Sequence, residues 1–276
     1  MAAPVAAFAD VGRVPVDALG AARRELHWAF QVLAAAGHSL GTARNDDRHT
    51  AAQWNEARGA FITAPLPDRR LALEPATLTL GVVQGRSLRP RFPVGERTLD
   101  EAMTWAATAL GAPEALRRPG GYTLPSHPVA DGDAFTAPGD ETTELAAWFR
   151  SAASLLGVIA KAHAEASPLT LWPHHFDLAT LITLDPGAKA ETARSIGVGF
   201  SPGDATYDRP YFYVTPWPYP DGDLPELLAG RWHRDGFTAA VLTGDEITAL
   251  NPADRPELVG GFVATATRAA RTLLQP

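Results

Sequence analysis

Four stretches of the chain carry hydrophobic residues at the spacing of an α-helix. The first begins at Asp17, an N-cap residue type, and runs to about residue 36, with Gly37 placed to end it. His27 lies on the flank of its apolar face, where it is either solvated or packed against another helix. The residues of that face are Leu19, Ala22, Leu26, Phe30 and Leu33.

The other three helical stretches have clear boundaries in the sequence. The first of them, 98–111, opens with a capping box formed by Thr98 and Glu101 and closes at a glycine. A long apolar stripe predicts a helix that begins at a capping aspartate and covers 140–166. A last helix is predicted from about residue 252 to the end of the chain.

The first half of the chain also contains a pattern typical of strands. Residues 38–67 are irregular, but hydrophobic and polar positions alternate from Leu71 to Val83, as in a half-buried strand. A turn at Gln84-Gly85 and a second run at 87–94 predict a returning partner strand. We therefore expect an antiparallel pair there.

The last hundred residues predict a second antiparallel sheet. Four short apolar runs follow one another, and the sequences DPG, SPGD and PDGD between them favour turns. Short connections between successive strands are typical of an antiparallel meander. The four runs are 176–183, 195–200, 211–215 and 237–242.

The order of these elements predicts an α+β fold, in which antiparallel sheets, including a C-terminal meander, pack with about four helices. We expect a single unit over 1–276, with two possible similar halves at about 17–111 and 141–274. A Pro/Gly-rich connection at 112–140 would join them. Neither a Gly-rich phosphate loop nor a G-x-S-x-G elbow occurs in the sequence.

Composition narrows the classes of function. A hydrophobic content of 46% with 20% charged residues is ordinary for a soluble globular protein. The net charge of −7 gives no expectation of nucleic-acid binding, and no uncharged apolar window is long enough to predict a membrane span. Cysteine is absent, which excludes disulfides and thiolate chemistry. Together with an N-terminal stretch that is a poor match to a signal peptide, this favours the cytoplasm.

The predicted meander gathers polar and aromatic residues at one edge of its sheet. The start of the first strand, the end of the second and the start of the third share that edge. His233 and Asp235 precede the fourth strand and are expected at the opposite edge. The candidate ligand-binding residues at the shared edge are Trp172, His175, Asp177, Ser201, Asp204, Tyr211 and Tyr213.

His175 and Asp177 are the candidate catalytic residues. If the strand includes them, its alternation puts both on one face and His174 on the other. A carboxylate beside an imidazole fixes the tautomer and raises the basicity of the ring. That arrangement suits a general base, a pair of metal ligands, or a buried structural hydrogen bond, and the sequence leaves all three open.

A second polar cluster lies in the irregular segment of the first half. Asp46, Asp47 and His49 follow one another closely, and a divalent metal would be held if His49 and Asp47 folded over His175 and Asp177. The alternative is that Asp46 or Asp47 only caps a short helical turn. His127 and His163 are expected to have no role in a site.

Three C-terminal segments resemble a family of uncharacterised bacterial proteins, a domain of unknown function. They are LWPHHFDLA at 171–179, GFSPGD at 199–204 and RPYFYVTPWPYP at 209–220. The pattern of that family is LWPxHFDLA, then SPGD, then PYxYVxPW, so His175 and Asp177 match it and His174 occupies the variable place. The resemblance implies one continuous structural unit and no particular activity.

Three functions remain open from the sequence. The first, which we favour, is binding of a small molecule at the aromatic and polar sheet edge. The second is a metal-dependent or His/Asp-based hydrolase-like enzyme that uses His175 and Asp177, and the third is a structural or interaction protein without a catalytic site. The sequence identifies no cofactor and no oligomeric state.

Overall fold

The computed structural model describes residues 8–188 and 192–275, and these divide into two compact units. The first, here the C-terminal unit, consists of Met1–Asp17, Ala147–Leu169 and Asp177–Pro276. The second, the N-terminal unit, consists of Ala18–Ala146 and Thr170–Phe176. The Pro/Gly-rich stretch 112–140, which we expected to join two halves, therefore lies within the N-terminal unit along its whole length.

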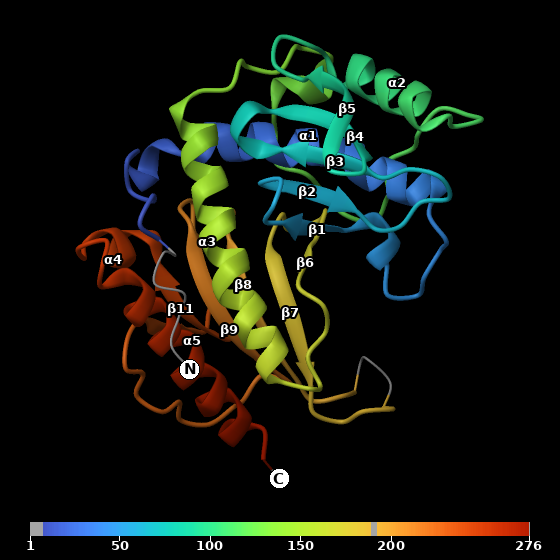
Figure 1. The fold of residues 1–276 in the computed structure, drawn as a ribbon. Helices are drawn as coiled ribbons and strands as arrows, with labels where there is room; N and C mark the ends of the chain where they lie inside the picture. The colour runs from blue at the N-terminus through green and yellow to red at the C-terminus, as the bar shows by residue number, and fades with distance from the viewer. Residues whose placement is uncertain (1–7, 189–191, 276) are drawn as a thin grey trace. The chain divides into compact units, whose positions relative to one another are not determined.

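The N-terminal unit contains an antiparallel sheet with the strand order β6-β1-β2-β3-β4-β5 (Figure 1). The unit also contains two helices. The short strand β6 directly follows residue 169, where a segment of the C-terminal unit ends. The helices are α1 (Gly20–Leu40) and α2 (Leu99–Leu110), and the strands are β1 (Ala52–Asn55), β2 (Ala60–Thr63), β3 (Leu71–Glu74), β4 (Thr79–Gln84), β5 (Ser87–Pro93) and β6 (Thr170–Leu171).

The C-terminal unit contains strands in the order β10-β11-β9-β8-β7, again all antiparallel. The predicted meander and the α+β fold class are thereby confirmed. The helices are α3 (Asp140–Ala162), of which residues from 147 onward belong to this unit, α4 (Gly244–Thr248) and α5 (Arg255–Leu273), and the strands are β7 (Leu178–Thr183), β8 (Ser195–Ser201), β9 (Tyr211–Trp217), β10 (Arg231–His233) and β11 (Ala239–Thr243).

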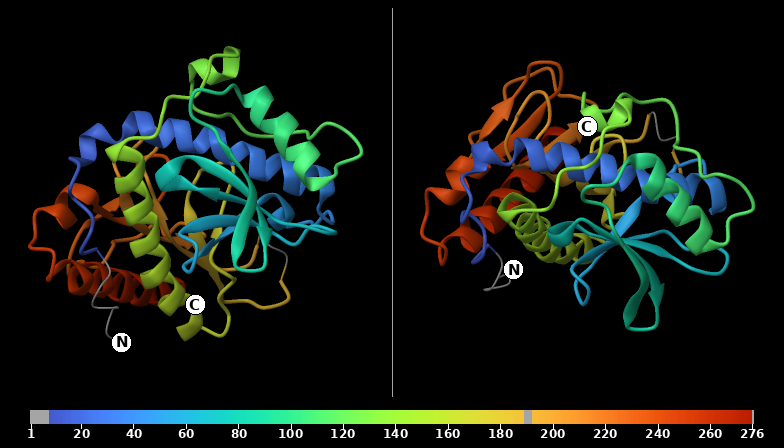
Figure 2. Two further views of the ribbon diagram at one scale, coloured as in Figure 1. Left: turned by 45° about the horizontal axis from the view of Figure 1, so that its top comes forward. Right: turned by 90° about the horizontal axis from the view of Figure 1, so that it is seen from above.

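Aromatic residues form the core between α3 and the sheet of the C-terminal unit. The ring of Trp148 stacks on Phe200 with 6.0 Å between centroids, and Phe8 packs edge-on against both Trp148 and Phe212. All four side chains are buried. Because Phe200 on β8 and Phe212 on β9 are direct partners, they lie on one face of the sheet, and α3 and α5 cover that face (Figures 1 and 2).

Helix α3 is the one described helix that is long and apolar enough, by length and composition, to span a membrane. Of its most apolar 18-residue window, 61% is buried inside the structure. Its contacts with Phe200 give this burial a reason, since Trp148 and Phe149 both pack on that ring. The apolar residues of α3 are therefore those of a helix that packs in the core of its unit.

In the N-terminal unit each helix is fixed to the sheet by an aromatic pair. Phe30 of α1 meets Phe61 of β2 edge-on with 6.2 Å between the ring centroids. Trp105 of α2 stacks on Phe92 of β5 at 5.3 Å. The predicted capping box of α2 is confirmed, and Gly111 ends that helix in the left-handed conformation with φ 69°.

The boundaries of α1 differ from those predicted. Asp17 lies in a short 3-10 turn before the helix, and the helix continues through Gly37 to Leu40. Gly37 has another role, because a Cβ at this position would overlap the backbone carbonyl of His49. The absence of a side chain lets the segment around His49 pass directly over the helix, so the glycine permits a close approach and does not end the helix.

The strand predicted at 71–83 is two strands. A 3-10 turn at Pro75–Thr77 separates β3 from β4, and Leu78 after it adopts a left-handed conformation with φ 45°. Pro75 lacks the N–H that a continuous ladder would need. Alternation along the sequence continues across the turn, and this made the two strands look like one.

Several elements were not predicted. β1 and β2 lie in the segment 38–67 that we expected to be irregular, and each has four residues, too few to show alternation clearly. α4 was also not predicted, although Thr243 and Glu246 form a complete capping box.

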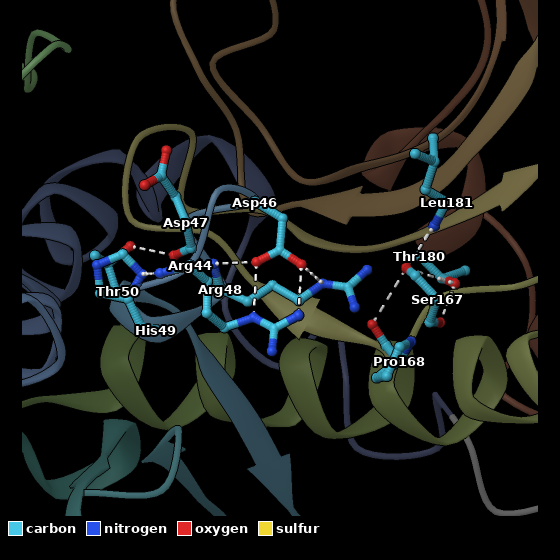
Figure 3. A network of polar contacts seen from close by, with 10 residues as sticks. All are labelled: Arg44, Asp46, Asp47, Arg48, His49, Thr50, Ser167, Pro168, Thr180 and Leu181. Atoms are coloured by element: carbon cyan, nitrogen blue, oxygen red, sulfur yellow. Dashed lines mark hydrogen bonds and ion pairs between the residues drawn. The ribbon is translucent and has the colours of Figure 1, made fainter. Parts of the chain in front are cut away.

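Helix α3 ends at Ala162, four residues earlier than expected. Beyond it, Ser167 ties the chain to β7: Thr180 Oγ1 donates to the carbonyl of Ser167 at 2.6 Å, and the Leu181 N–H donates to Ser167 Oγ at 3.0 Å (Figure 3). These bonds hold the chain around Ser167 in an extended conformation beside β7, so the helix cannot continue to residue 166.

Candidate functional site

Strand register brings the predicted edge together within the C-terminal unit. Ser201 at the end of β8 is the direct partner of Tyr211 at the start of β9, and Phe200 is the partner of Leu178 at the start of β7. Asp177 precedes Leu178, so it lies at the same edge. The predicted edge residues that belong to this unit are therefore neighbours.

The first polar pair of this edge joins Asp177 to Tyr213. The Tyr213 hydroxyl donates a hydrogen bond to Oδ2 of Asp177, whose side chain is buried. Burial, and then the charge of Asp177, raises the pKa of Tyr213 well above its usual value. The phenol therefore stays protonated and acts as a donor.

Gly199 makes room for this pair. It is the direct partner of Tyr213 across β8 and β9, and a Cβ at Gly199 would overlap the ring and hydroxyl of Tyr213. The ring thus lies flat over the glycine on its way to Asp177. Any side chain at this position would displace the phenol.

The second polar pair joins Asp204 to Tyr211. The Tyr211 hydroxyl donates to Oδ2 of Asp204 at 2.5 Å, and the other oxygen accepts the N–H groups of Thr206 at 2.7 Å and Tyr207 at 2.8 Å. Burial, followed by the charge of Asp204, raises the pKa of Tyr211. The SPGD sequence is therefore a turn, as its residues predict, and its aspartate also fixes a strand residue.

Tyr207 extends this arrangement to His233. The Tyr207 ring lies 5.0 Å from that of Tyr211, and its hydroxyl lies 3.0 Å from Nδ1 of His233. The guanidinium of Arg231 lies over the Tyr207 ring at 5.6 Å from its centroid. His233 pairs with Ala239 at the start of β11, as expected for the far edge, yet its ring reaches Tyr207, which sequence reasoning missed.

We call this set the tyrosine–carboxylate cluster. Its carboxylates can only accept hydrogen bonds, whereas its phenols can donate. Asp204, Tyr207, Tyr213 and His233 are each partly exposed. The cluster consists of Asp177, Ser201, Asp204, Tyr207, Tyr211, Tyr213 and His233.

Trp172, His174 and His175 belong to the N-terminal unit, and their conformation corrects the prediction. β7 begins at Leu178, whereas residues 173–175 form a turn closed by a hydrogen bond of 2.9 Å from the Phe176 N–H to the Trp172 carbonyl. The strand alternation that paired His175 with Asp177 therefore does not apply. A proline followed by two polar residues favours a turn over a strand start.

Helix α1 holds this turn in place. His27 Nε2 lies 2.8 Å from the carbonyl oxygen of Pro173, and Gln31 Nε2 donates to the same oxygen at 3.0 Å. Phe176, in a left-handed conformation with φ 54°, stacks on the His27 ring at 4.9 Å. Burial lowers the pKa of His27 to about 4, so the ring is neutral at pH 7. His27 is thus neither solvated nor packed against another helix, the two alternatives that the sequence left open; it is packed and hydrogen-bonded against the turn that precedes β7.

His174 has a similarly low pKa. Burial, and then the neighbouring His175 ring at 4.4 Å, lowers the pKa of His174 to about 4, and the charge of Asp47 opposes this shift. Trp172 also contacts His174, with 5.9 Å between the rings. His174, which occupies the variable place of the family pattern, is therefore neutral at pH 7, and its ring is largely packed against its neighbours.

The Asp46-Asp47-Arg48-His49 loop is stabilised internally (Figure 3). Asp46 accepts bonds of 2.9 and 3.0 Å from the Arg44 guanidinium, which lowers the pKa of Asp46 to about 2. His49 Nδ1 accepts the N–H of Arg44 at 3.3 Å, whereas the Asp47 carboxylate points away from these contacts. Asp47 precedes a 3-10 turn at Arg48–Thr50 but makes no capping bond with its side chain.

Within the ranges 8–188 and 192–275, no three His, Asp or Glu side chains gather as a metal-binding group. The set proposed from the sequence, His49, Asp47, His175 and Asp177, is thus not assembled as one. The geometry instead concentrates polar chemistry in the tyrosine–carboxylate cluster.

Comparisons with known proteins give no further guide to the site. No model of a protein family matches the chain, and no curated protein and no solved structure matches it.

Proposed function

We propose that the protein binds a small polar molecule at the tyrosine–carboxylate cluster. The observation that carries the proposal is that two carboxylates, Asp177 and Asp204, are each bonded by a tyrosine on the same sheet edge. Bringing carboxylates together in a largely buried place costs free energy, which an apolar edge would avoid. Such an arrangement is typical of binding sites.

The chemistry of the cluster favours a ligand with amino or hydroxyl groups. A ligand that reaches a carboxylate oxygen must donate a hydrogen bond, and an ammonium group would also be attracted to the faces of the tyrosine rings. The guanidinium of Arg231 over Tyr207 is an example of this attraction within the chain itself. Phe237, Ala239 and Val241 supply an apolar floor beside the rings.

Thermal unfolding of the full chain in the presence of a library of small amines and polyols tests the proposal. We expect at least one compound to raise the midpoint temperature with a saturable concentration dependence. In Asp204→Asn the shift in midpoint temperature should be much smaller, because the amide replaces one of the two acceptor oxygens with an NH₂ donor.

Tyr219→Phe is the matched control, since Tyr219 is an exposed tyrosine outside the cluster. It should bind the same compound with unchanged affinity. A library without any binder, or a compound that binds Asp204→Asn as well as the original chain, contradicts the proposal.

We also propose that the protein acts in the cytoplasm. The absence of cysteine supports this location, and so does the burial of α3, the one described helix that is long and apolar enough to span a membrane. Fractionation of cells that express the tagged chain would check it, and recovery in a membrane or secreted fraction would contradict it.

A further inference from the structure

A second site, distinct from the tyrosine–carboxylate cluster, lies between α3 and α5 of the C-terminal unit. The two helices line a cavity of about 350 Å³ that opens to solvent beside Ala264 and Arg268, and this volume is at the small end of the range for ligand pockets. We propose that this cavity binds a short aliphatic monocarboxylate. The proposal does not depend on the function proposed above.

One part of the cavity is hydrocarbon. Leu155, Val158 and Ile159 of α3 face Ala264 and Gly260 of α5, and the two small residues of α5 leave the space that larger side chains would fill. No polar group lies among these five residues. An alkyl chain placed along them would leave water, which is favourable in proportion to its apolar area.

Thr267, a buried threonine, also lines the cavity. Thr267 is 5% exposed, and its Oγ1 has no hydrogen-bond partner among the described residues. Its neighbours on α5 behave differently: Thr265 Oγ1 donates to the Gly261 carbonyl at 2.7 Å, and Thr272 Oγ1 donates to the Arg268 carbonyl at 3.1 Å. Thr267 makes no such bond to its own helix, and a buried hydroxyl without a partner costs free energy.

The polar part of the cavity is basic. Arg268 and Arg271 both line it, and His163, the residue after α3, lies beside them with Nδ1 3.5 Å from the Arg271 guanidinium. Arg271 is already paired with Glu165 at 2.7 Å, whereas Arg268 forms no ion pair with any described residue. An anionic head group would therefore complement Arg268.

The three features together define the ligand class. A carboxylate accepts from both Arg268 and the Thr267 hydroxyl, and the attached chain occupies the apolar part. A longer lipid would leave part of its chain in water outside the cavity, and an uncharged alcohol leaves Arg268 without a counter-charge. His163, for which the sequence predicted no role in a site, is thereby placed at the rim of one.

Calorimetric titration of the full chain with octanoate at pH 7.5 tests the proposal. We expect saturable binding at one site, with 1-octanol and acetate at least about tenfold weaker, because each lacks one of the two recognised parts. Arg268→Gln and Thr267→Val should each weaken octanoate binding by roughly ten- to hundredfold, the effect of one hydrogen bond to a charged group. NMR shifts of the Ile159 and Ala264 methyl groups should report the same saturation.

Thr265→Val is the matched control, since that hydroxyl is bonded within its own helix, and it should bind octanoate as the original chain does. Tyr213→Phe should also leave octanoate binding unchanged, which separates this site from the tyrosine–carboxylate cluster. No binding of octanoate, equal binding of 1-octanol, or unchanged affinity in both Arg268→Gln and Thr267→Val would overturn the proposal.

Discussion

The hydroxyl of Tyr211 lies 2.5 Å from Oδ2 of Asp204, and through this bond the first residue of β9 holds the SPGD turn that precedes it. The same aspartate accepts two N–H groups of its own turn. One side chain therefore fixes both the loop and its attachment to the sheet.

Removal of the Tyr211 hydroxyl should destabilise the protein. We expect Tyr211→Phe to lower the free energy of unfolding by about 1.5–3 kcal/mol, the range for a hydrogen bond to a charged group. Urea unfolding followed by circular dichroism measures the change. Tyr219→Phe, at an exposed position, should change the value by less than about 0.5 kcal/mol. Equal effects of the two substitutions would show that the Tyr211 bond contributes nothing.

Stability should fall at alkaline pH. Burial raises the pKa of Tyr122 to about 12 and also raises the pKa values of Tyr211 and Tyr213 above the value of about 10 for an unfolded chain. A raised pKa contributes stability that is complete below pH ~10 and is lost as the pH rises above it, because the unfolded phenols ionise first. Urea midpoints between pH 9 and 11.5 should therefore decrease, and less steeply in Tyr211→Phe. A flat profile would contradict the raised values.

Stability should also fall on mild acidification, through His27. Burial holds its pKa at about 4 against 6.5 for the free side chain, so the unfolded state binds the proton first. The contribution, about 3 kcal/mol for such a shift, is present above pH ~6.5 and lost as the pH falls towards 4. His27→Gln keeps an amide donor near Pro173 but cannot titrate. Its free energy of unfolding should depend less on pH between 6.5 and 4, and an unchanged slope would exclude His27 as the source.

Two glycines within helices should respond in opposite directions to alanine. Gly37→Ala introduces a methyl group that overlaps the His49 carbonyl, and we expect a loss of at least about 2 kcal/mol. Gly157→Ala in α3 meets nothing within 4 Å and should gain roughly 0.5–1 kcal/mol from helix propensity. Thermal unfolding of the two variants compares them directly. A stable Gly37→Ala protein would mean that the His49 segment can move away from α1.

Local signals in the sequence predicted much of the fold. The capping box at Thr98, the return strand after Gln84-Gly85 and the meander after residue 177 depend on contacts between near neighbours, so a single sequence reveals them. The roles of Gly37 and Pro75 were misjudged because each depends on a tertiary contact or on one missing N–H. Gly37 carries the same signal as an ordinary helix-ending glycine, whereas Pro75 was a signal against a continuous strand that the alternation around it outweighed.

For the candidate site, the sequence located the edge but not the bonds. Topology placed Ser201, Asp204 and Tyr211 together. Which phenol bonds to which carboxylate depends on side-chain rotamers, and the spacing of residues along the sequence does not reveal these. The reach of His233 to Tyr207 and the docking of His27 on Pro173 depend on residues 26 and 146 positions apart. The pairing of His175 with Asp177 was inferred from a strand that begins only at Leu178.

The ring of Tyr213 lies in the space that a side chain at Gly199 would occupy, and this constrains how the sequence can evolve at the two positions. The two positions can change only together, since a larger residue at 199 expels the ring and the loss of the ring leaves a hollow over the glycine. In an alignment of homologous chains they should covary, with an aromatic residue at 213 wherever 199 is glycine. Such a covarying pair would mark chains that retain the same buried carboxylate at 177.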